Sequence, residues 1–297
     1  MMEGVEPLST DEIRRAVQSA LAEDIGTGDV TTLATVPEDA KASARVVARE
    51  RLVVAGLALA EAAFLELAPG MEINPLVVDG RQANPGDTLL QVRGQARAIL
   101  TAERVALNFL QRLSGVATLT AEFVEAVRPT AAKILDTRKT TPGWRRLEKY
   151  AVTCGGGHNH RLGLFDMVLI KDNHLAALAH EPPHPIGAAV RRARLAYPNL
   201  KIEVEAETPV QVQEALESGA DVILLDNMTP QDLRTAVFFI NGKAKTEASG
   251  GVTLATVRQI AETGVDFISV GALTHSARAV DIALDFDETD REPAFHP

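Results

Sequence analysis

The hydrophobic positions near the start of the chain change their period. Ile13, Val17 and Leu21 recur at helical spacing and predict an N-terminal helix. From 42 to 94 the apolar residues instead form short β-like stretches broken by Pro-Gly and Asp-Gly turns, at 44–48, 76–78 and 88–92. One helix, near 58–67, interrupts them. Strands with helices against one face are typical of a small α+β, sandwich-like domain.

A longer helical pattern follows and marks a predicted domain boundary. Apolar residues recur at helical spacing from Ala98 to Leu113, and Ser114-Gly115 then offers a break. We therefore predict an N-terminal domain over 1–114, a second domain over 115–276, and a C-terminal helix and tail over 277–297.

The second domain alternates short apolar runs with helical segments, which predicts parallel strands joined by crossover helices. The runs lie at 133–135, 167–170, 202–204, 222–225, 246–248 and 267–270. Two of these units are also similar in sequence, because ALESGADVI at 215–223 resembles IAETGVDFI at 260–268. Repeated βα units favour a barrel over a doubly wound open sheet. With six clear strands, we predict an α/β fold that is an irregular, incomplete β/α barrel.

Polar residues follow each of these runs, where the carboxyl ends of parallel strands meet on one face. The residues found there include Arg138, Lys139, Lys171, Glu205, Asp226, Ser249, Gly250 and Gly271. An open sheet would also bind ligands at that edge. These positions therefore predict one shared site.

The segment 136–174 is basic within an acidic chain. It has seven Lys and Arg residues against four acidic ones, with histidines interleaved. Guanidinium groups grip carboxylates and phosphates at two points, so the segment suits a ligand with several anionic groups, although a solvated charged face is the plain alternative. Metal ligation by Cys154 with His158 and His160 lacks a usual zinc spacing.

Two late glycine loops predict a phosphate site. Ser249-Gly250-Gly251 follows one late strand, and a loop from Gly271 to His275 follows the next. Barrels frequently bind phosphate with the loops after their last two strands. Ordinary turns are the alternative.

Glu205 and Asp226 end two neighbouring strands, opposite the basic groups. Hard oxygen ligands together with substrate phosphates suit Mg²⁺. The same carboxylates could instead neutralise Lys139 and Lys171 in a structural ion network, and the sequence leaves both interpretations open.

Composition narrows the class of protein. The 297 residues are 46% hydrophobic and 24% charged, which excludes a wholly disordered or fibrous chain. A net charge of −10 argues against nucleic-acid or anionic-membrane partners. No apolar run approaches the roughly 20 residues of a membrane span. With a single cysteine and no apparent signal peptide, we expect the cytoplasm.

Taken together, the motifs resemble the quinolinate phosphoribosyltransferase family. The matching stretches run in order from Glu23 to Ser276: EDIGTGDVTT, TAERVALNFLQRLSGVAT, DTRKTTPGWRRLEKYAV, GGGHNHRLGLFDMVLIKDNH, EVEAET, ILLDN, ASGGVT and VGALTHS. The resemblance implies phosphoribosyl transfer from phosphoribosyl pyrophosphate to quinolinate, with Mg²⁺. The products would be nicotinate mononucleotide, pyrophosphate and CO₂. It also implies a homodimer, or a higher homo-oligomer, with shared sites.

The resemblance also implies roles for single residues. Quinolinate would be bound by Arg138, His160 and Arg161, with Arg104 reaching in from the partner subunit. Lys139, Lys171, Glu205 and Asp226 would serve catalysis and phosphoribosyl pyrophosphate, the two carboxylates on the metal side. The 5′-phosphate would be held by Ser249, Gly250, Gly271 and His275.

Three other functions remain as alternatives. One is a molybdenum-transport-associated paralogue in the same superfamily. Another is a Schiff-base aldolase, because Lys171 ends an apolar run as an aldolase lysine does. The third is a phosphosugar-binding protein without catalysis.

Overall fold

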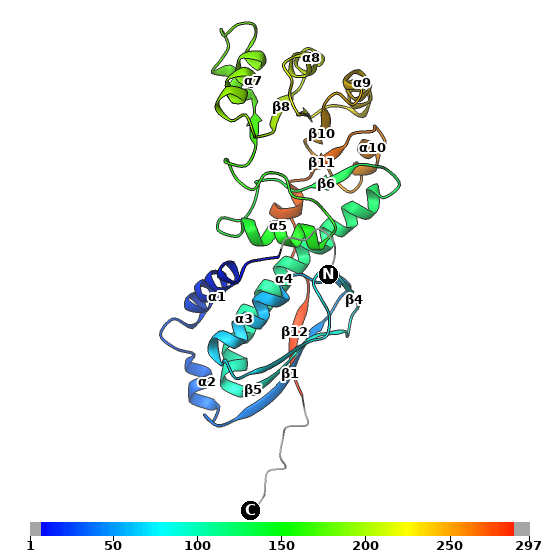
Figure 1. Ribbon diagram of the computed structural model, residues 1–297. Helices are drawn as coiled ribbons and strands as arrows, with labels where there is room; N and C mark the ends of the chain where they lie inside the picture. The colour runs from blue at the N-terminus through cyan, green and yellow to red at the C-terminus, as the bar shows by residue number, and fades with distance from the viewer. Residues whose placement is uncertain (1–6, 288–297) are drawn as a thin grey trace, which may run out of the picture. The chain divides into compact units, whose positions relative to one another are not determined.

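The computed structural model describes residues 7–287, and the chain divides into two compact units (Figure 1). Within the described residues, unit 1 holds 7–119, 146–156 and 277–287, and unit 2 holds 120–145 and 157–276. The predicted boundary after residue 114 instead falls inside one helix, α4 (Ala96–Val127).

Unit 1 is built on an antiparallel sheet with the strand order β12-β1-β5-β3. The strands are β1 (Lys41–Ala48), β3 (Glu72–Pro75), β5 (Thr88–Gln95) and β12 (Ile282–Phe286), and β2 (Leu52–Val53) pairs separately with β4 (Gln82–Ala83). The strand predicted at 76–78 is wrong, because pairing with β5 ends at Pro75 and the next residues bend away.

The predicted C-terminal helix is also wrong within the described residues. Ile282–Phe286 is strand β12, which pairs antiparallel with β1, Leu284 opposite Val46. The free edge of β1 offers backbone hydrogen bonds that a helix there would leave unmade. The rest of the predicted tail, 288–297, lies outside the described residues.

The helices of unit 1 bury their apolar residues in its core, where Leu59, Phe64 and Leu110 are fully enclosed. They are α1 (Thr10–Ile25), α2 (Val30–Thr35), α3 (Leu57–Leu67), most of α5 (Arg145–Cys154) and the first part of α4. In α1, Ser9 and Glu12 form a capping box that satisfies the first free N–H groups.

Helix α4 continues through Ser114-Gly115, where the sequence suggests a break. The Ser114 hydroxyl donates to the Ala55 carbonyl oxygen and accepts from the Ala55 N–H, so this residue anchors the helix to its neighbour. Gly115 leaves room for the Arg278 carbonyl, since a Cβ there would lie 1.9 Å from that oxygen. The two residues serve packing and do not end the helix.

Unit 2 confirms the predicted barrel-like α/β fold. Its six parallel strands follow the order β6-β11-β10-β9-β8-β7. They are β6 (Lys133–Leu135), β7 (Val168–Ile170), β8 (Ile202–Ala206), β9 (Val222–Asp226), β10 (Lys245–Ser249) and β11 (Phe267–Ser269). Among the described residues no strand pairing joins β6 to β7, so the barrel is incomplete, as predicted.

Helices α7 (Pro185–Ala196), α8 (Pro209–Glu217) and α10 (Val257–Ala261) pack against these strands (Figure 1). The same unit contains α6 (Asp172–Ala176), α9 (Pro230–Ile240) and α11 (Ala272–His275). Thr208 and Thr229 cap α8 and α9, each followed by a proline that needs no hydrogen-bond partner in the first turn. Within the described range, no helix combines the length and apolar character that crossing a membrane requires.

We predict that Gly115→Ala destabilises the protein by about 1–3 kcal/mol, because the added methyl would overlap the Arg278 carbonyl oxygen. Urea unfolding measures the change. Gly70→Ala is the matched control, since a Cβ there meets nothing within 4 Å. Equal stability of the two variants would contradict the packing role of Gly115.

Candidate active site

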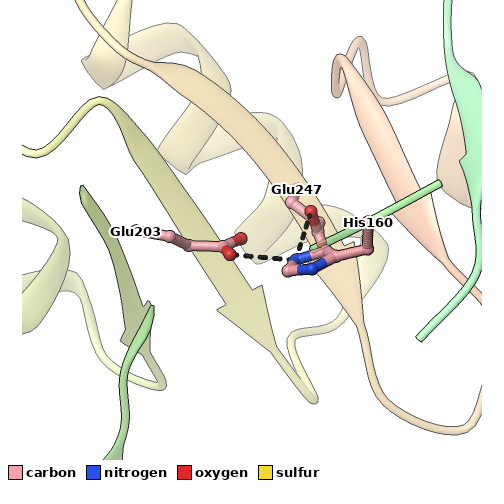
Figure 2. A group of neighbouring side chains, drawn as sticks. All are labelled: His160, Glu203 and Glu247. Carbon is pink, nitrogen blue, oxygen red and sulfur yellow. Dashed lines mark hydrogen bonds and ion pairs between the residues drawn. The ribbon is translucent and has the colours of Figure 1, made fainter. Parts of the chain in front are cut away.

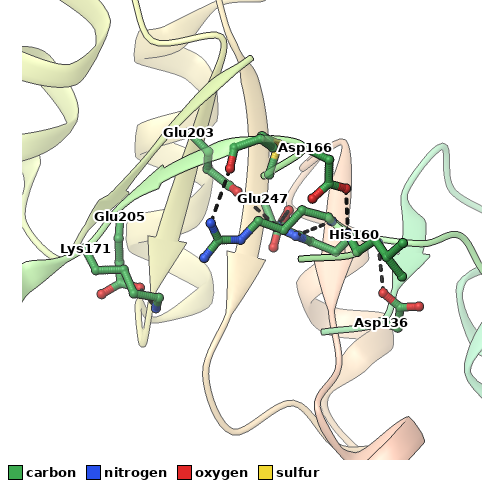
Figure 3. A network of polar contacts seen from close by, with 10 residues as sticks. Asp136, His160, Asp166, Lys171, Glu203, Glu205 and Glu247 are labelled. Atoms are coloured by element: carbon green, nitrogen blue, oxygen red, sulfur yellow. Dashed lines mark hydrogen bonds and ion pairs between the residues drawn. The ribbon is translucent and has the colours of Figure 1, made fainter. Parts of the chain in front are cut away.

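The carboxyl ends of β7 and β8 bring together an amine and a carboxylate (Figure 3). Lys171 directly follows β7, and Glu205 is the penultimate buried residue of β8. The Lys171 Nζ donates to Glu205 Oε2 at 2.5 Å, while the lysine side chain remains 45% exposed. This pair therefore faces the open end of the barrel.

Asp226 joins this pair from the end of β9. Burial raises the pKa of its carboxyl, and the negative charge of Glu205 raises the pKa further. Lys171 and Lys139 act in the opposite direction, and so does a hydrogen bond from Ser249. Two carboxylates and two lysines thus share one edge, as the sequence predicts.

The loop after β10 folds tightly onto the loop after β9. The Asn227 N–H donates to the Ser249 carbonyl, and the Asn227 side-chain amide donates to Asp226. Gly250 has φ +97°, and a Cβ there would lie 2.2 Å from the Asn227 Oδ1. Only glycine fits this approach, so Gly250 allows the two loops to meet.

The loop after β11 brings two predicted site residues to Gly271. A Cβ at Gly271 would lie 3.0 Å from Lys139 Cδ and 3.1 Å from His275 Nε2. The Thr274 hydroxyl donates to the Lys139 carbonyl at 2.7 Å, which fixes the lysine backbone to this loop. The predicted residues Lys139, Gly271 and His275 are therefore neighbours.

Arg138 and Arg161 bring two positive charges near each other. Burial lowers the pKa of the Arg161 guanidinium, and the charge of Arg138 lowers it further. The buried Arg138 Nε has no hydrogen-bond partner among the described residues. A buried donor without an acceptor, beside a second guanidinium, is suited to an anionic ligand.

The segment that carries His160 and Arg161 fills the gap between β6 and β7. His158 forms a parallel bridge with Leu135, and its backbone bonds Ile134 and Asp136. The chain then turns inward. The His160 N–H donates to the Asp136 carboxylate at 2.9 Å.

The His160 side chain enters a buried group of carboxylates (Figure 2). Its Nε2 lies 2.9 Å from Glu203 Oε2 and 3.6 Å from Glu247 Oε2. The two glutamates, on β8 and β10, are 0% and 2% exposed. Burial raises the pKa of both carboxyls, because it removes water from the charged form, and the charge of Glu203 raises the pKa of Glu247 further.

The sequence analysis missed Glu203 and Glu247, although a signal for Glu203 exists. Side chains alternate across a strand, so Glu203 and Glu205 share one face of β8 while Val204 faces the other. If Glu205 faces the barrel interior, so does Glu203. In β10, Glu247 precedes the predicted site residue Ser249 by two positions, so the same alternation places these two side chains on one face.

A cavity of about 240 Å³ lies at the other end of the barrel. Residues at the starts of strands line it, among them Lys133 and Lys201 on the rim side, and His160 and Arg161 line it as well. The Arg161 guanidinium donates to the Met167 carbonyl, just before β7. Of the predicted quinolinate ligands, His160 and Arg161 therefore line a cavity at the end of the barrel opposite to Lys171.

Arg104 lies exposed on α4 within unit 1. Its role in binding substrate across a subunit interface stays a prediction. The other predicted site residues all belong to unit 2.

We predict that Glu247→Gln makes stability less dependent on pH. The raised pKa of Glu247 means that the folded state holds a proton which the unfolded chain loses above about pH 4.5. In the wild type, the contribution of this group to the free energy of unfolding therefore falls as pH rises from there toward the raised pKa. Glutamine does not titrate, so this fall disappears. Urea unfolding between pH 5 and 8 tests it, and equal slopes for the two proteins would contradict it.

Comparison with known proteins agrees with this geometry. Residues 29–114 match the N-terminal domain of quinolinate phosphoribosyl transferase, and residues 116–285 match its C-terminal domain. A solved nicotinate-nucleotide pyrophosphorylase from Francisella tularensis is 38% identical, with a TM-score of 0.89, covering 97% of this chain and 100% of that one.

Two plant relatives are similar along most of their length. The mitochondrial decarboxylating quinolinate phosphoribosyltransferase 2a of Nicotiana tabacum is 45% identical, over 94% of this chain and 83% of its own. The chloroplastic carboxylating nicotinate-nucleotide pyrophosphorylase of Arabidopsis thaliana is 46% identical, over 96% and 86%. Given these two compartments, the cytoplasmic location stays a prediction. The chain belongs to the quinolinate phosphoribosyltransferase family.

Proposed function

We propose that unit 2 transfers the phosphoribosyl group of phosphoribosyl pyrophosphate to quinolinate and that decarboxylation follows. The products are nicotinate mononucleotide, pyrophosphate and CO₂, a step of NAD biosynthesis. One observation carries the proposal: Lys139, Lys171, Glu205 and Asp226 gather at one edge, and a guanidinium pair lies in the same unit. A site of this kind suits a diphosphate, a developing sugar cation and a dicarboxylate.

The late loops are placed to hold the 5′-phosphate. Ser249, Gly250, Gly271 and His275 come from the loops after β10 and β11. Glycine lets the backbone approach a phosphate closely, so its N–H groups can donate to the anion. Lys139 lies close to Gly271 and His275, which supports a phosphate site that adjoins the site of the diphosphate.

The charged groups at the edge serve the departure of pyrophosphate. When the bond to the sugar carbon breaks, positive charge develops on the ribose and negative charge on the leaving diphosphate. Lys139 and Lys171 stabilise the diphosphate, while Glu205 and Asp226 favour the sugar cation. No covalent enzyme intermediate is needed.

Glu205 and Asp226 are the residues that would hold Mg²⁺. The fit rests on their mutual repulsion, since Glu205 raises the pKa of Asp226, and a divalent cation would relieve it. Bound to the diphosphate, Mg²⁺ would supply charge neutralisation of the leaving group. The protein's part is to aim the two carboxylates at that point.

Arg138 and Arg161 orient quinolinate by its carboxylates. Fixing the ring nitrogen toward the sugar carbon is an alignment effect that can be worth several kcal/mol. Arg104 of a second subunit would complete the pocket, which makes the working form a homodimer or a higher homo-oligomer. His160 is predicted to contact quinolinate as well.

Loss of CO₂ follows from the adduct itself. Once the ring nitrogen is alkylated, its positive charge stabilises the carbanion left when the adjacent carboxylate departs. The protein's task is then to hold the adduct and exclude water.

The Schiff-base alternative is disfavoured by the surroundings of Lys171. An aldolase lysine must be a neutral amine to attack a carbonyl. Here Nζ forms an ion pair with Glu205, which favours the charged ammonium.

We predict that Lys139→Ala lowers turnover by about 100-fold, because a stabilising charge at the leaving group is lost. Release of CO₂ from carboxyl-labelled quinolinate, in the presence of phosphoribosyl pyrophosphate and Mg²⁺, measures it. Lys243→Ala, at an exposed lysine of the same unit, should leave turnover unchanged. Turnover of Lys139→Ala equal to that of the control would refute the assigned role.

Co-expression tests the shared site. Arg104→Ala and Arg138→Ala homodimers should both bind quinolinate poorly, whereas a mixed dimer keeps one intact site. Random pairing of equal amounts then leaves about a quarter of the wild-type sites active. If mixing restores no activity, Arg104 does not act across an interface.

A further inference from the structure

Three polar groups of His160 bond to the protein itself. Its backbone N–H donates to Asp136, and its Nδ1 accepts from the Arg161 N–H at 2.7 Å. Because Nδ1 accepts a hydrogen bond, it carries no proton, so the proton is on Nε2. Nε2 then donates to Glu203 Oε2 at 2.9 Å. These two bonds hold the ring in one orientation and favour the tautomer that has its proton on Nε2.

Two buried carboxyl groups lie beside this ring, Glu203 at hydrogen-bond distance and Glu247 at ion-pair distance. Glu203 and Glu247 come from different strands and converge on the same nitrogen (Figure 2). The second oxygen of each, Oε1, is buried and has no hydrogen-bond partner among the described residues. Burying a carboxyl group costs free energy unless a partner compensates it. The position of both groups beside one ring indicates that they hold this ring in place.

We infer that Glu203 and Glu247 are positioning residues, which fix the His160 ring and, through it, the backbone N–H of Arg161. The inference rests on the proposed function, because Arg161 is there a quinolinate ligand. The Nδ1 of the ring accepts from the Arg161 N–H and so fixes the position of the Arg161 backbone. The orientation of the ring is in turn fixed at Nε2 by the two glutamates.

Arg161 lies among charges of both signs in a partly buried place. Arg138 repels its guanidinium, while the carboxylates of Glu203 and Asp166 attract it, so its position depends on how these groups are held. The chain is fixed on the other side as well, where the Asp166 carboxylate accepts from the N–H groups of Leu162 and Gly163 at 2.7 and 2.9 Å (Figure 3). The backbone of Arg161 is therefore held on both sides, by His160 before it and by the Asp166 carboxylate after it. The glutamates act on the first of these contacts, through the His160 ring.

This role does not require a direct contact between the ring and quinolinate, which stays a separate prediction, because both ring nitrogens already bond within the chain. It also differs from a metal site, although a histidine and two carboxylates are suitable ligands.

Paired substitutions at Glu203 test the inference. Glu203→Leu removes the acceptor for His160 Nε2, whereas Glu203→Gln keeps an acceptor and the side-chain shape. We expect the leucine variant to raise the KM for quinolinate at least about tenfold, with the KM for phosphoribosyl pyrophosphate and kcat within about threefold of the wild type. The glutamine variant should restore the KM.

A second histidine–glutamate pair in the same unit gives the control. His184 Nδ1 lies 3.4 Å from Glu214 Oε2, on the outer helices α7 and α8. Glu214→Leu should change neither KM. A glutamine variant at Glu203 as impaired as the leucine variant would overturn positioning in favour of a role for the charge. Equal changes in both KM values would overturn it in favour of general structural support.

Nitrogen-15 NMR of labelled histidines gives a measurement without any variant, should Glu203→Leu not fold. We expect His160 as the Nε2–H tautomer, unchanged when quinolinate is added. A ring that changes tautomer or gains a proton on binding would overturn the inference. So would a stoichiometric metal ion, found by elemental analysis in the wild type and lost in Glu247→Gln. Wild-type protein that releases no CO₂ from quinolinate would refute the proposed function, while the tautomer result would stand by itself.

Discussion

The two-residue repeat of a β-strand is the constraint on which the site of unit 2 depends. It places Glu203 and Glu205 on one face of β8, about 7 Å apart along the strand. The upper carboxylate pairs with Lys171 at the open edge, and the lower one bonds His160 in the interior. One strand therefore carries both a residue proposed for the reaction and a residue proposed to position a substrate ligand. A shift of one residue in its register would remove both together.

The incomplete barrel makes this arrangement possible. Among the described residues no strand pairs β6 with β7, and the bridge of His158 to Leu135 extends only the β6 side, after which the chain leaves strand geometry. It can then turn inward and carry His160 and Arg161 toward the interior, where Asp136 and Asp166 fix its backbone. In a closed barrel, a seventh strand would send alternate side chains outward. The irregularity is thus a means of placing consecutive residues in the interior.

Much of unit 2 could be predicted from the sequence because each strand and helix is indicated by the residues within it. Each βα unit repeats the same pattern, and parallel strands all end on one face, so Lys171, Glu205 and Asp226 could be placed together without coordinates. Strand β12 could not, because it is defined by pairing with β1 across more than two hundred residues of sequence. Ser114-Gly115 was misjudged for a similar reason. Their small size matches a helix break equally well, and only the Arg278 carbonyl shows that they serve close packing.

The buried carboxyls show a different limit of sequence reasoning. A charged residue in a strand is normally taken for a solvent-facing position, and nothing local marks Glu247 as enclosed. Its environment arises from β8, β10 and the inward-turning segment together, and none of these lies near the others in sequence. The same three-dimensional convergence creates pairs of like charge: Arg138 with Arg161, and Glu205 with Asp226.

Each of those pairs is unfavourable in the protein alone and becomes favourable with the right ligand. A dicarboxylate between two guanidinium groups removes their repulsion, and positive charge beside two carboxylates removes theirs. A ligand of the matching sign would therefore gain part of its binding free energy from the relief of this electrostatic repulsion. In unit 2 the carboxylates of Glu205 and Asp226 lie beside two lysines at the strand ends, while Arg161 lines the inner cavity. A substrate pair with one anionic partner and one partner that becomes cationic as it reacts would match both like-charged pairs, which an ordinary structural ion network would not require.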